Sequence, residues 1–209
     1  MIPKSILNTA PASLAVTLAT VKTYLRVDGS SEDAEITAMI NAATQRLEAM
    51  TDKKFVSQKW DIYFDDFPGS YGGAWWDGER EGAISEMFSA NKNINLPYGQ
   101  LLSVESFKTF DDDNVEYTFD STNYNIDTVA PYGVIALKYG AVWPQTVLRT
   151  VNGIKIAATF GYASVPQDIQ EAIKILVGAM FENRGDEIPK IPAQVSLLVE
   201  PYRRFKVGC

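Results

Sequence analysis

The spacing of apolar residues changes twice along the chain, from a helical period to strand alternation and back. Between residues 17 and 50 apolar side chains recur every three or four positions, which predicts two amphipathic helices. Thr17 is placed to cap the first helix, and Asp28-Gly29-Ser30 ends it. The second helix begins at Ser31, with the acidic Glu32 and Asp33 in its first turn. Its apolar stripe consists of Ile36, Met39, Ile40, Ala43, Leu47 and Met50.

Strand alternation begins after residue 54. In FVSQKWDIYFDDF the apolar residues Val56, Trp60, Ile62 and Phe64 fall on one face, and Gln58 is the one polar residue among them. The polar run 111–114 predicts a hairpin turn between two strands. Short strands are predicted at 94–96, 104–110, 115–119, 124–126, 134–138 and 154–160.

The helical period returns at Pro166, which suits the first position of a helix. Gly185 is placed to cap the C-terminal end of this helix, and a short last helix precedes Pro201. The chain therefore belongs to the α+β class, with a bundle of N- and C-terminal helices and an inserted small antiparallel β-sheet or sandwich. We expect a discontinuous helical domain over residues 1–54 and 163–209, and an inserted β domain over 55–162.

Composition excludes several kinds of site. The 209 residues include 26 acids against 19 bases, a formal charge of −7, and no histidine. Catalytic triads and zinc sites that need histidine are therefore excluded, and the single cysteine, Cys209, leaves no disulfide framework. The N-terminal apolar patches are interrupted and the apolar run 173–180 is short, so we expect neither an export signal nor a membrane span.

The carboxylates and glycines give only weak signals of chemistry. Asp111, Asp112 and Asp113 could bind calcium, but their spacing differs from that of an EF-hand loop and suits a solvated turn. Weak metal binding there stays open. A carboxylate pair for glycoside hydrolysis ranks lower, because no acid has an apolar setting that raises its pKa. No glycine motif fits a phosphate-binding loop, so we expect no enzyme, metal or cofactor.

Two segments are candidates for partner binding. The loop 68–92 contains aromatic side chains and a methionine without helical or strand periodicity, which fits either a partner surface or a plug that folds back on the sheet. A carbohydrate platform is a weaker option for the same loop. The C-terminal tail places bases in an acidic chain, as a solvated terminus or as a segment that docks in an acidic groove of another subunit. The residues concerned are Tyr71, Trp75, Trp76, Met87 and Phe88 in the loop, and Tyr202, Arg203, Arg204, Phe205 and Lys206 in the tail.

Three stretches in order resemble the ring-forming head–tail connector (head-completion or adaptor) proteins of long-tailed phages and phage-derived particles. The first is VKTYLRVDGSSEDAEITAMINAATQRLEAMTDKKFVSQKWDIYFDDFP, similar to two opening helices that lead into a strand. The second is INLPYGQLLSVESFKTFDDDNVEYTFDSTNYNID, similar to the family's hairpin. The third is GYASVPQDIQEAIKILVGAMFENRGD followed by SLLVEPYRRF, similar to its closing helices. The long aromatic loop 69–91 and the step Tyr98-Gly99-Gln100 depart from the family pattern.

The resemblance implies a structural role in the virion, for a protein made in the host cytoplasm. Family members form a ring of about twelve copies between the portal protein and the tail-side stopper, and DNA passes through it without sequence-specific binding. A monomer free in solution is compatible with this. The resemblance assigns portal contact to the C-terminal helix and tail, ring contacts to the helices, and an outward or tail-side position to the β insertion. The alternative function is a binding module that uses the tryptophan loop as a carbohydrate or receptor platform.

Overall fold

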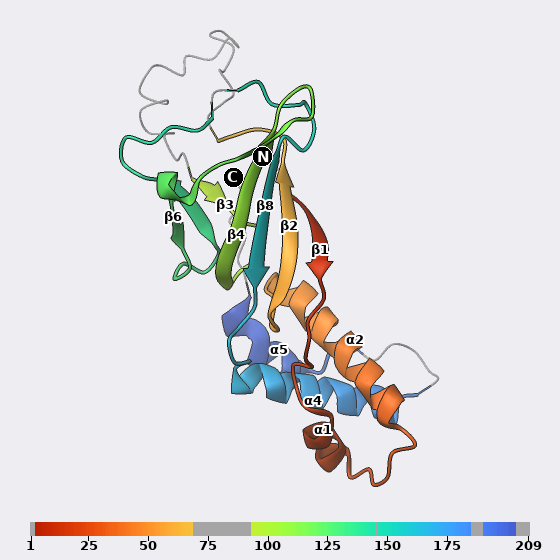
Figure 1. The fold of residues 1–209 in the computed structure, drawn as a ribbon. Coiled ribbons are helices and arrows are strands. Elements are labelled where there is room, and N and C mark those ends of the chain that lie inside the picture. Colours follow the sequence, from red (N-terminus) through yellow and green to blue (C-terminus); the bar gives the residue numbers. More distant parts are fainter. Residues whose placement is uncertain (1–2, 69–92, 145, 185–189, 204–209) are drawn as a thin grey trace, which may run out of the picture. The chain divides into compact units, whose positions relative to one another are not determined.

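The protein divides into two compact units, which we call the sheet unit and the helical unit. The computed structural model (Figure 1) describes residues 3–68, 93–144, 146–184 and 190–203. The sheet unit comprises Met1–Asn8, Lys59–Pro97 and Leu101–Thr159, and the helical unit comprises Thr9–Gln58, Tyr98–Gln100 and Phe160–Cys209. The predicted α+β class is confirmed by the presence of helices and two antiparallel sheets in one chain.

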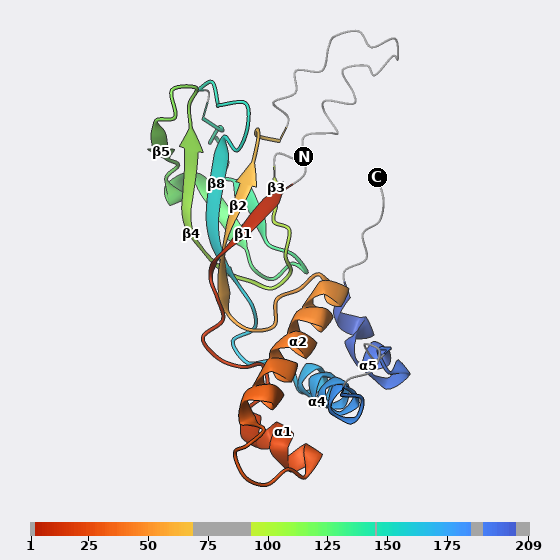
Figure 2. The ribbon, with the colours of Figure 1, turned by 90° about the vertical axis from the view of Figure 1, so that its right-hand side faces the viewer.

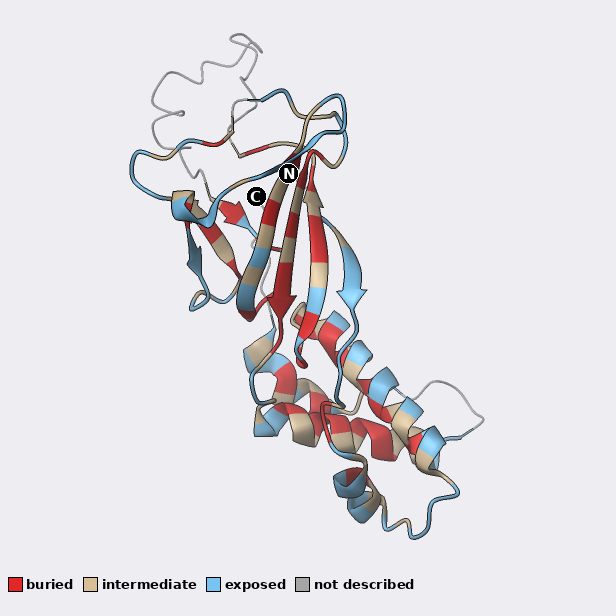
Figure 3. Ribbon diagram, viewed as in Figure 1, coloured by how far each residue is buried: buried red, intermediate tan, exposed pale blue. Residues whose placement is uncertain are grey.

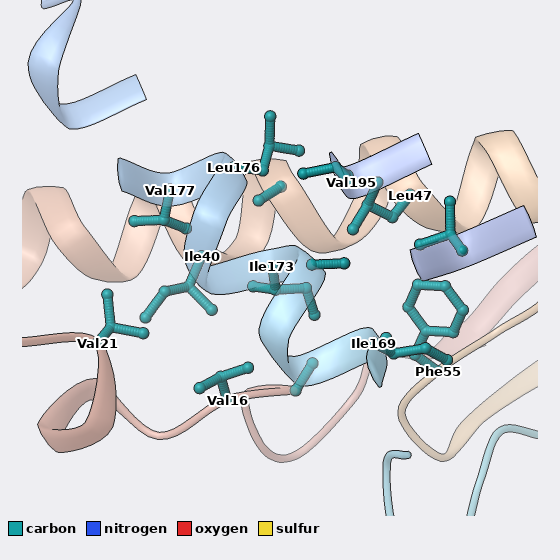
Figure 4. Packing of buried hydrophobic residues seen from close by; sticks show 14 of the residues in the cluster. Val16, Val21, Ile40, Leu47, Phe55, Ile169, Ile173, Leu176, Val177 and Val195 are labelled. Carbon is teal, nitrogen blue, oxygen red and sulfur yellow. The ribbon is translucent and has the colours of Figure 1, made fainter. Parts of the chain in front are cut away.

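Helices from both ends of the sequence share one core in the helical unit. α2 (Asp33–Thr51) packs against α4 (Gln167–Glu182), and α1 (Leu18–Leu25) contacts both of them. α5 (Ala193–Val199), followed by the 3₁₀ turn η2 (Glu200–Tyr202), packs against α4. Burial of each large apolar side chain contributes about 1.5–3 kcal/mol. Figure 4 shows this core, which includes Val21, Ile40, Leu47, Phe55, Ile169, Ile173, Leu176, Val177 and Val195.

The ends of these helices follow local rules that are readable in the sequence. The Thr17 side chain accepts a hydrogen bond from the backbone N–H of Thr20 at 3.3 Å, so the predicted cap of α1 is confirmed. The chain leaves α1 and α2 through left-handed residues, Arg26 (φ 56°) and Asp52 (φ 58°). At its C-terminal end α4 is capped by Asn183. The predicted cap, Gly185, lies outside the described residues.

The sheet unit contains a five-stranded and a three-stranded antiparallel sheet. The larger has the order β1 (Lys4–Thr9), β2 (Gln58–Phe64), β8 (Ile154–Phe160), β4 (Leu101–Phe110) and β5 (Glu116–Thr118), so that β1 and β5 are its edges (Figure 2). The predicted hairpin at 111–114 is present, with β4 and β5 paired through Phe110 and Glu116. The smaller sheet has the order β3 (Ile94–Asn95), β7 (Val134–Leu137) and β6 (Tyr124–Asp127), and the short turn η1 (Ser121–Asn123) precedes β6.

An aromatic cluster joins the two sheets. Phe107 on β4 lies 5.6 Å from the ring of Tyr124 on β6, 5.3 Å from Phe119 and 5.8 Å from Trp143, measured between ring centroids. Phe67 stacks on Trp143 at 5.0 Å. Offset and edge-on aromatic pairs of this kind add about 0.5–1.5 kcal/mol each beyond their buried area. This cluster is therefore the main apolar connection between the sheets.

Gly161 allows a close backbone approach in the helical unit directly after β8. Its φ is +134°, which side chains rarely adopt, and a Cβ here would lie 2.6 Å from the backbone of Val56. The segment after β8 therefore passes the chain at Val56 only because residue 161 is glycine.

The N-terminal strand differs from the sequence prediction. Residues 1–54 were expected in the helical domain, whereas Lys4–Thr9 forms an edge strand of the sheet unit. Figure 3 shows β1 almost entirely exposed beside the buried central strands. A strand with both faces exposed has no alternation of apolar and polar residues, so the periodicity that identifies other strands is missing here. Tyr98–Gln100 also differs, because it belongs to the helical unit and not to the expected β domain 55–162.

Candidate partner-binding site at the end of the helical unit

The predicted C-terminal contact segment begins at a packed tyrosine. Pro201 has no backbone N–H to continue a helix, and after α5 the chain makes the short turn η2, which ends at Tyr202. The Tyr202 ring meets Tyr162 edge-on, with centroids 6.5 Å apart. Its hydroxyl donates to Asp168 Oδ2 at 3.4 Å, near the N-terminus of α4. These contacts fix Tyr202, the last residue of η2, on the helical unit.

Lys53 lies over the ring of Tyr202. Lys53 Nζ lies 5.9 Å from the centroid of Tyr202, within the range of a cation–π contact. Burial lowers the pKa of Lys53 because desolvation disfavours its charged form. Burial, and then the neighbouring charge of Asp168, raises the pKa of the Tyr202 hydroxyl, so this group stays protonated at neutral pH. At the start of the tail, Tyr202 and Lys53 therefore form a partly buried contact between an aromatic ring and a cation.

A second lysine lies over a tyrosine of the segment that departs from the family pattern. Lys54 Nζ is 4.6 Å from the centroid of Tyr98, and Tyr98 meets Phe160 edge-on at 5.6 Å. Backbone hydrogen bonds hold the segment on the helical unit, from Gly99 N to Asp52 O at 3.4 Å and from Gly161 N to Gln100 O at 3.0 Å. The unusual step Tyr98-Gly99-Gln100 therefore forms part of the surroundings of the two lysines.

The structure describes only part of the predicted sites. Arg203 is exposed just beyond Tyr202, and Tyr202 itself is half-buried. The predicted tail residues Arg204, Phe205 and Lys206 lie outside the described residues, as do all the predicted loop residues Tyr71, Trp75, Trp76, Met87 and Phe88. The sequence did not predict that Lys53 would lie over the ring of Tyr202. Two adjacent lysines after α2 in an acidic chain are visible in the sequence, but no local pattern relates either of them to residue 202.

The remaining polar features have ordinary structural roles. Asp111 Oδ1 accepts a hydrogen bond from Val115 N at 2.8 Å, which closes the hairpin turn. Within the described ranges no group of three or more His, Cys, Asp or Glu side chains is arranged to hold a metal ion. A hollow of about 320 Å³ in the helical unit is lined by hydroxyl, amide and apolar groups, among them Thr17, Ser57, Tyr162 and Gln170. Its described lining has no carboxylate and so lacks the acid pair of a glycosidase.

No described helix has the length and apolar character needed to cross a membrane.

The sequence was compared with known families after this geometry was established. Residues 15–99, from the start of the helical core to Gly99, match the model of the phage gp6-like head-tail connector proteins. The predicted resemblance to head–tail connectors is confirmed. The matched connector region includes α1, α2, β2 and the Lys53–Lys54 pair, so it covers one side of the candidate partner-binding site. No curated protein matches the sequence.

Similarity of fold to solved structures extends over the whole chain. A chain in the neck of an empty gene transfer agent particle, computed with C6 symmetry, is 20% identical with a TM-score of 0.71, covering 100% of this chain and 98% of that chain. A chain in the neck of the native particle, computed with C12 symmetry, is 21% identical with a TM-score of 0.72 at the same coverage. A chain from the virion of the native particle is 22% identical with a TM-score of 0.73, covering 98% of this chain and 97% of that chain. The similarity at this level of identity establishes a shared fold.

Proposed function

We propose that the protein is a structural head–tail connector, one subunit of a ring that joins the portal to the tail side of a phage or phage-derived particle. The observation that supports this best is the full-length fold likeness to chains of a particle neck. The match of residues 15–99 to head-tail connector proteins supports the same role independently. Both point to a virion protein that acts by assembly and not by catalysis.

The proposed ring has about twelve copies and encloses the path of the DNA. The neck of the related native particle was computed with C12 symmetry, which supports this number for a protein of the same fold. Contacts between unlike surfaces close into a ring when the rotation from copy to copy divides the circle. The acidic chain, with its net charge of −7, favours passage of DNA without tight binding, because basic side chains are needed to neutralise phosphates.

We assign portal contact to the C-terminal end of the helical unit. Lys53 lies over the ring of Tyr202, the exposed Arg203 follows it, and the sequence continues with the basic residues Arg204 and Lys206. A basic surface on an acidic protein is suited to an acidic groove of a different protein, since opposite charges guide association and fix the register. The tail-side stopper is then the partner of the sheet unit.

A portal-retention assay tests this assignment. Portal protein from the same genome is immobilised. Its retention of the full-length wild type is compared with its retention of the double variant Arg203→Glu/Arg204→Glu. We expect the variant to lose about tenfold or more in affinity, because two attractive charges become repulsive. The matched control is Arg26→Glu/Lys190→Glu, which makes the same charge change at two exposed positions elsewhere on the helical unit and retains wild-type binding. Equal retention of the tail variant and the control would show that the portal contacts another surface.

The alternative role as a carbohydrate or receptor platform depends on Trp75 and Trp76. Both lie outside the described residues, so no structural observation supports this role. Glycan binding that disappears in Trp75→Ala and Trp76→Ala would favour it over the connector role.

A further inference from the structure

Both edge strands of the five-stranded sheet are exposed on both faces. In β1 five of the six residues are exposed, and in β5 all three are exposed. Successive side chains of a strand point to opposite faces of the sheet, so the neighbours Ile6 (61% exposed) and Leu7 (43% exposed) leave apolar surface uncovered on each side of β1. On the opposite edge Val115 (47% exposed), directly before β5, and Tyr117 (46% exposed) leave apolar surface uncovered on one side of the sheet.

Each of these edge strands contains only one charged residue, Lys4 in β1 and Glu116 in β5. Soluble proteins cover edge strands or place charges, prolines and bulges on them, because an unprotected edge pairs with other chains. Here the inner strand β8 is largely buried, whereas β1 and β5 present apolar side chains at the two ends of the same sheet. Apolar edges at both ends of one sheet are the arrangement that repeated head-to-tail association requires.

The distribution of charge favours contact between unlike edges. The β5 edge and its turn have the acids Asp111, Asp112, Asp113 and Glu116, with Lys108 as the partner of Glu116. The β1 edge has no acid between residues 3 and 13, and its one charged residue is Lys4. Two β5 edges would bring two acidic clusters together, while a β1 edge meets a β5 edge without like-charge repulsion.

We propose that the β1 edge of one copy contacts the β5 edge of the next copy, with Ile6 and Leu7 against Val115 and Tyr117. The contact joins two different surfaces of the same chain and therefore propagates in one direction, which a ring needs. The inference rests on the proposed function, because it specifies how neighbouring subunits of the connector ring meet.

Disulfide trapping tests the contact in the full-length protein. In a Cys209→Ser background, the double variant Ile6→Cys/Tyr117→Cys is assembled, alone or with portal protein, oxidised mildly and run under non-reducing denaturing conditions. We expect a ladder of covalent oligomers, because each copy links to the next through two different positions. The matched control, Val129→Cys/Tyr117→Cys, replaces a 94% exposed residue away from both edges and gives no ladder. Dimers from Ile6→Cys alone, with no ladder in the double variant, would mean that β1 meets β1 and overturn the proposal.

A charge substitution at the same exposed position provides a second test. Ile6→Asp places an acid opposite the acidic β5 edge and raises the concentration needed for half-assembly by about tenfold or more, whereas Ile6→Lys has a smaller effect. Wild-type assembly measured in parallel separates this inference from the proposed function. If the wild type forms rings while Ile6→Asp assembles equally well and no ladder appears, the edge contact is wrong and the connector role stands. If the wild type forms no ring even with portal protein, both are wrong.

Discussion

Glu48 is a buried carboxylate that links the end of α2 to the segment leading into β2. It is only 7% exposed and accepts hydrogen bonds from Phe55 N at 2.8 Å and Gln58 Nε2 at 3.1 Å. Lys54 Nζ lies 3.4 Å away and balances its charge. The network also explains why Gln58 lies on the apolar side of its strand, since its amide meets a buried acceptor there.

Removal of Glu48 tests the strength of this network. Glu48→Ala removes the acceptor of the buried Phe55 N–H and one of the acceptors of the Gln58 amide, which also donates to Val56 O, so we expect a loss of about 3 kcal/mol in the free energy of unfolding. The control Glu171→Ala removes a partly exposed ion pair with Lys174 within one helix and costs about 0.5 kcal/mol or less. Urea unfolding followed by circular dichroism measures both. A loss for Glu48→Ala no larger than that of the control would contradict the structural role.

At the level of single residues, local rules were readable and distant contacts were not. Thr17 was predicted as a helix cap because its hydroxyl needs only a backbone N–H three residues away. Gln58 was visible as an exception to strand alternation, but its partner Glu48 is ten residues earlier in a helix. The approach of Lys53 to Tyr202 depends on the packing of the whole helical unit, which no local pattern encodes.

At the level of elements, β1 is held to the sheet unit mainly by polar contacts. Lys4 Nζ lies 2.8 Å from Asp65 Oδ1, and Asn152 N donates to the same oxygen at 2.8 Å. Asn8 Nδ2 donates to Asp61 Oδ2 at 3.0 Å. The Asn152 N–H, and then Lys4, lowers the pKa of Asp65, since both favour its ionised form. Ionised Asp65 therefore strengthens the attachment of β1, which also pairs with β2.

This dependence predicts how Asp65→Asn behaves as a function of pH. Because the pKa of Asp65 is lower in the folded protein, its contribution to stability is complete above the unfolded value of about 3.9 and is lost as pH falls through the folded pKa. The urea midpoint of the wild type should exceed that of Asp65→Asn above pH ~5. The difference reflects less than about 1 kcal/mol, as for exposed ion pairs, and should vanish in stronger acid.

The control for this experiment is Asp112→Asn, which removes a charge from the exposed turn and keeps a urea midpoint close to that of the wild type. A wild-type advantage over Asp65→Asn that persists unchanged at the lowest pH would show that the carboxylate does not hold β1.

Elements with one buried face were predictable, and elements without one were not. In the strand 154–160 and in the helix that follows Pro166, apolar residues recur with the spacing typical of a strand and of a helix. Both elements were predicted from this spacing and are present in the structure. β1 gave no such signal because Ile6 and Leu7 are adjacent and both exposed. The exposure that hid this strand in the sequence is also the observation on which the proposed contact between copies rests.

At the level of the whole molecule, the chain alternates between two discontinuous units. The short segment Tyr98–Gln100 returns to the helical unit between two long segments of the sheet unit, and such a brief crossing leaves no trace in composition. Sequence patterns sufficed for the α+β class, and the resemblance seen in three ordered stretches agrees with the connector model that matches residues 15–99. The connector role, the ring and its partners are proposals that rest on the similarity to connector proteins and to chains of a particle neck.

The particle mass shows whether this chain assembles into a closed ring. Native mass spectrometry over a wide concentration range, with and without portal protein, is combined with negative-stain images of the largest species. We expect closed rings of one size, and twelve subunits of 23.1 kDa give about 277 kDa. A monomer under every condition, portal protein included, or open chains of variable length, would show that the chain forms no ring.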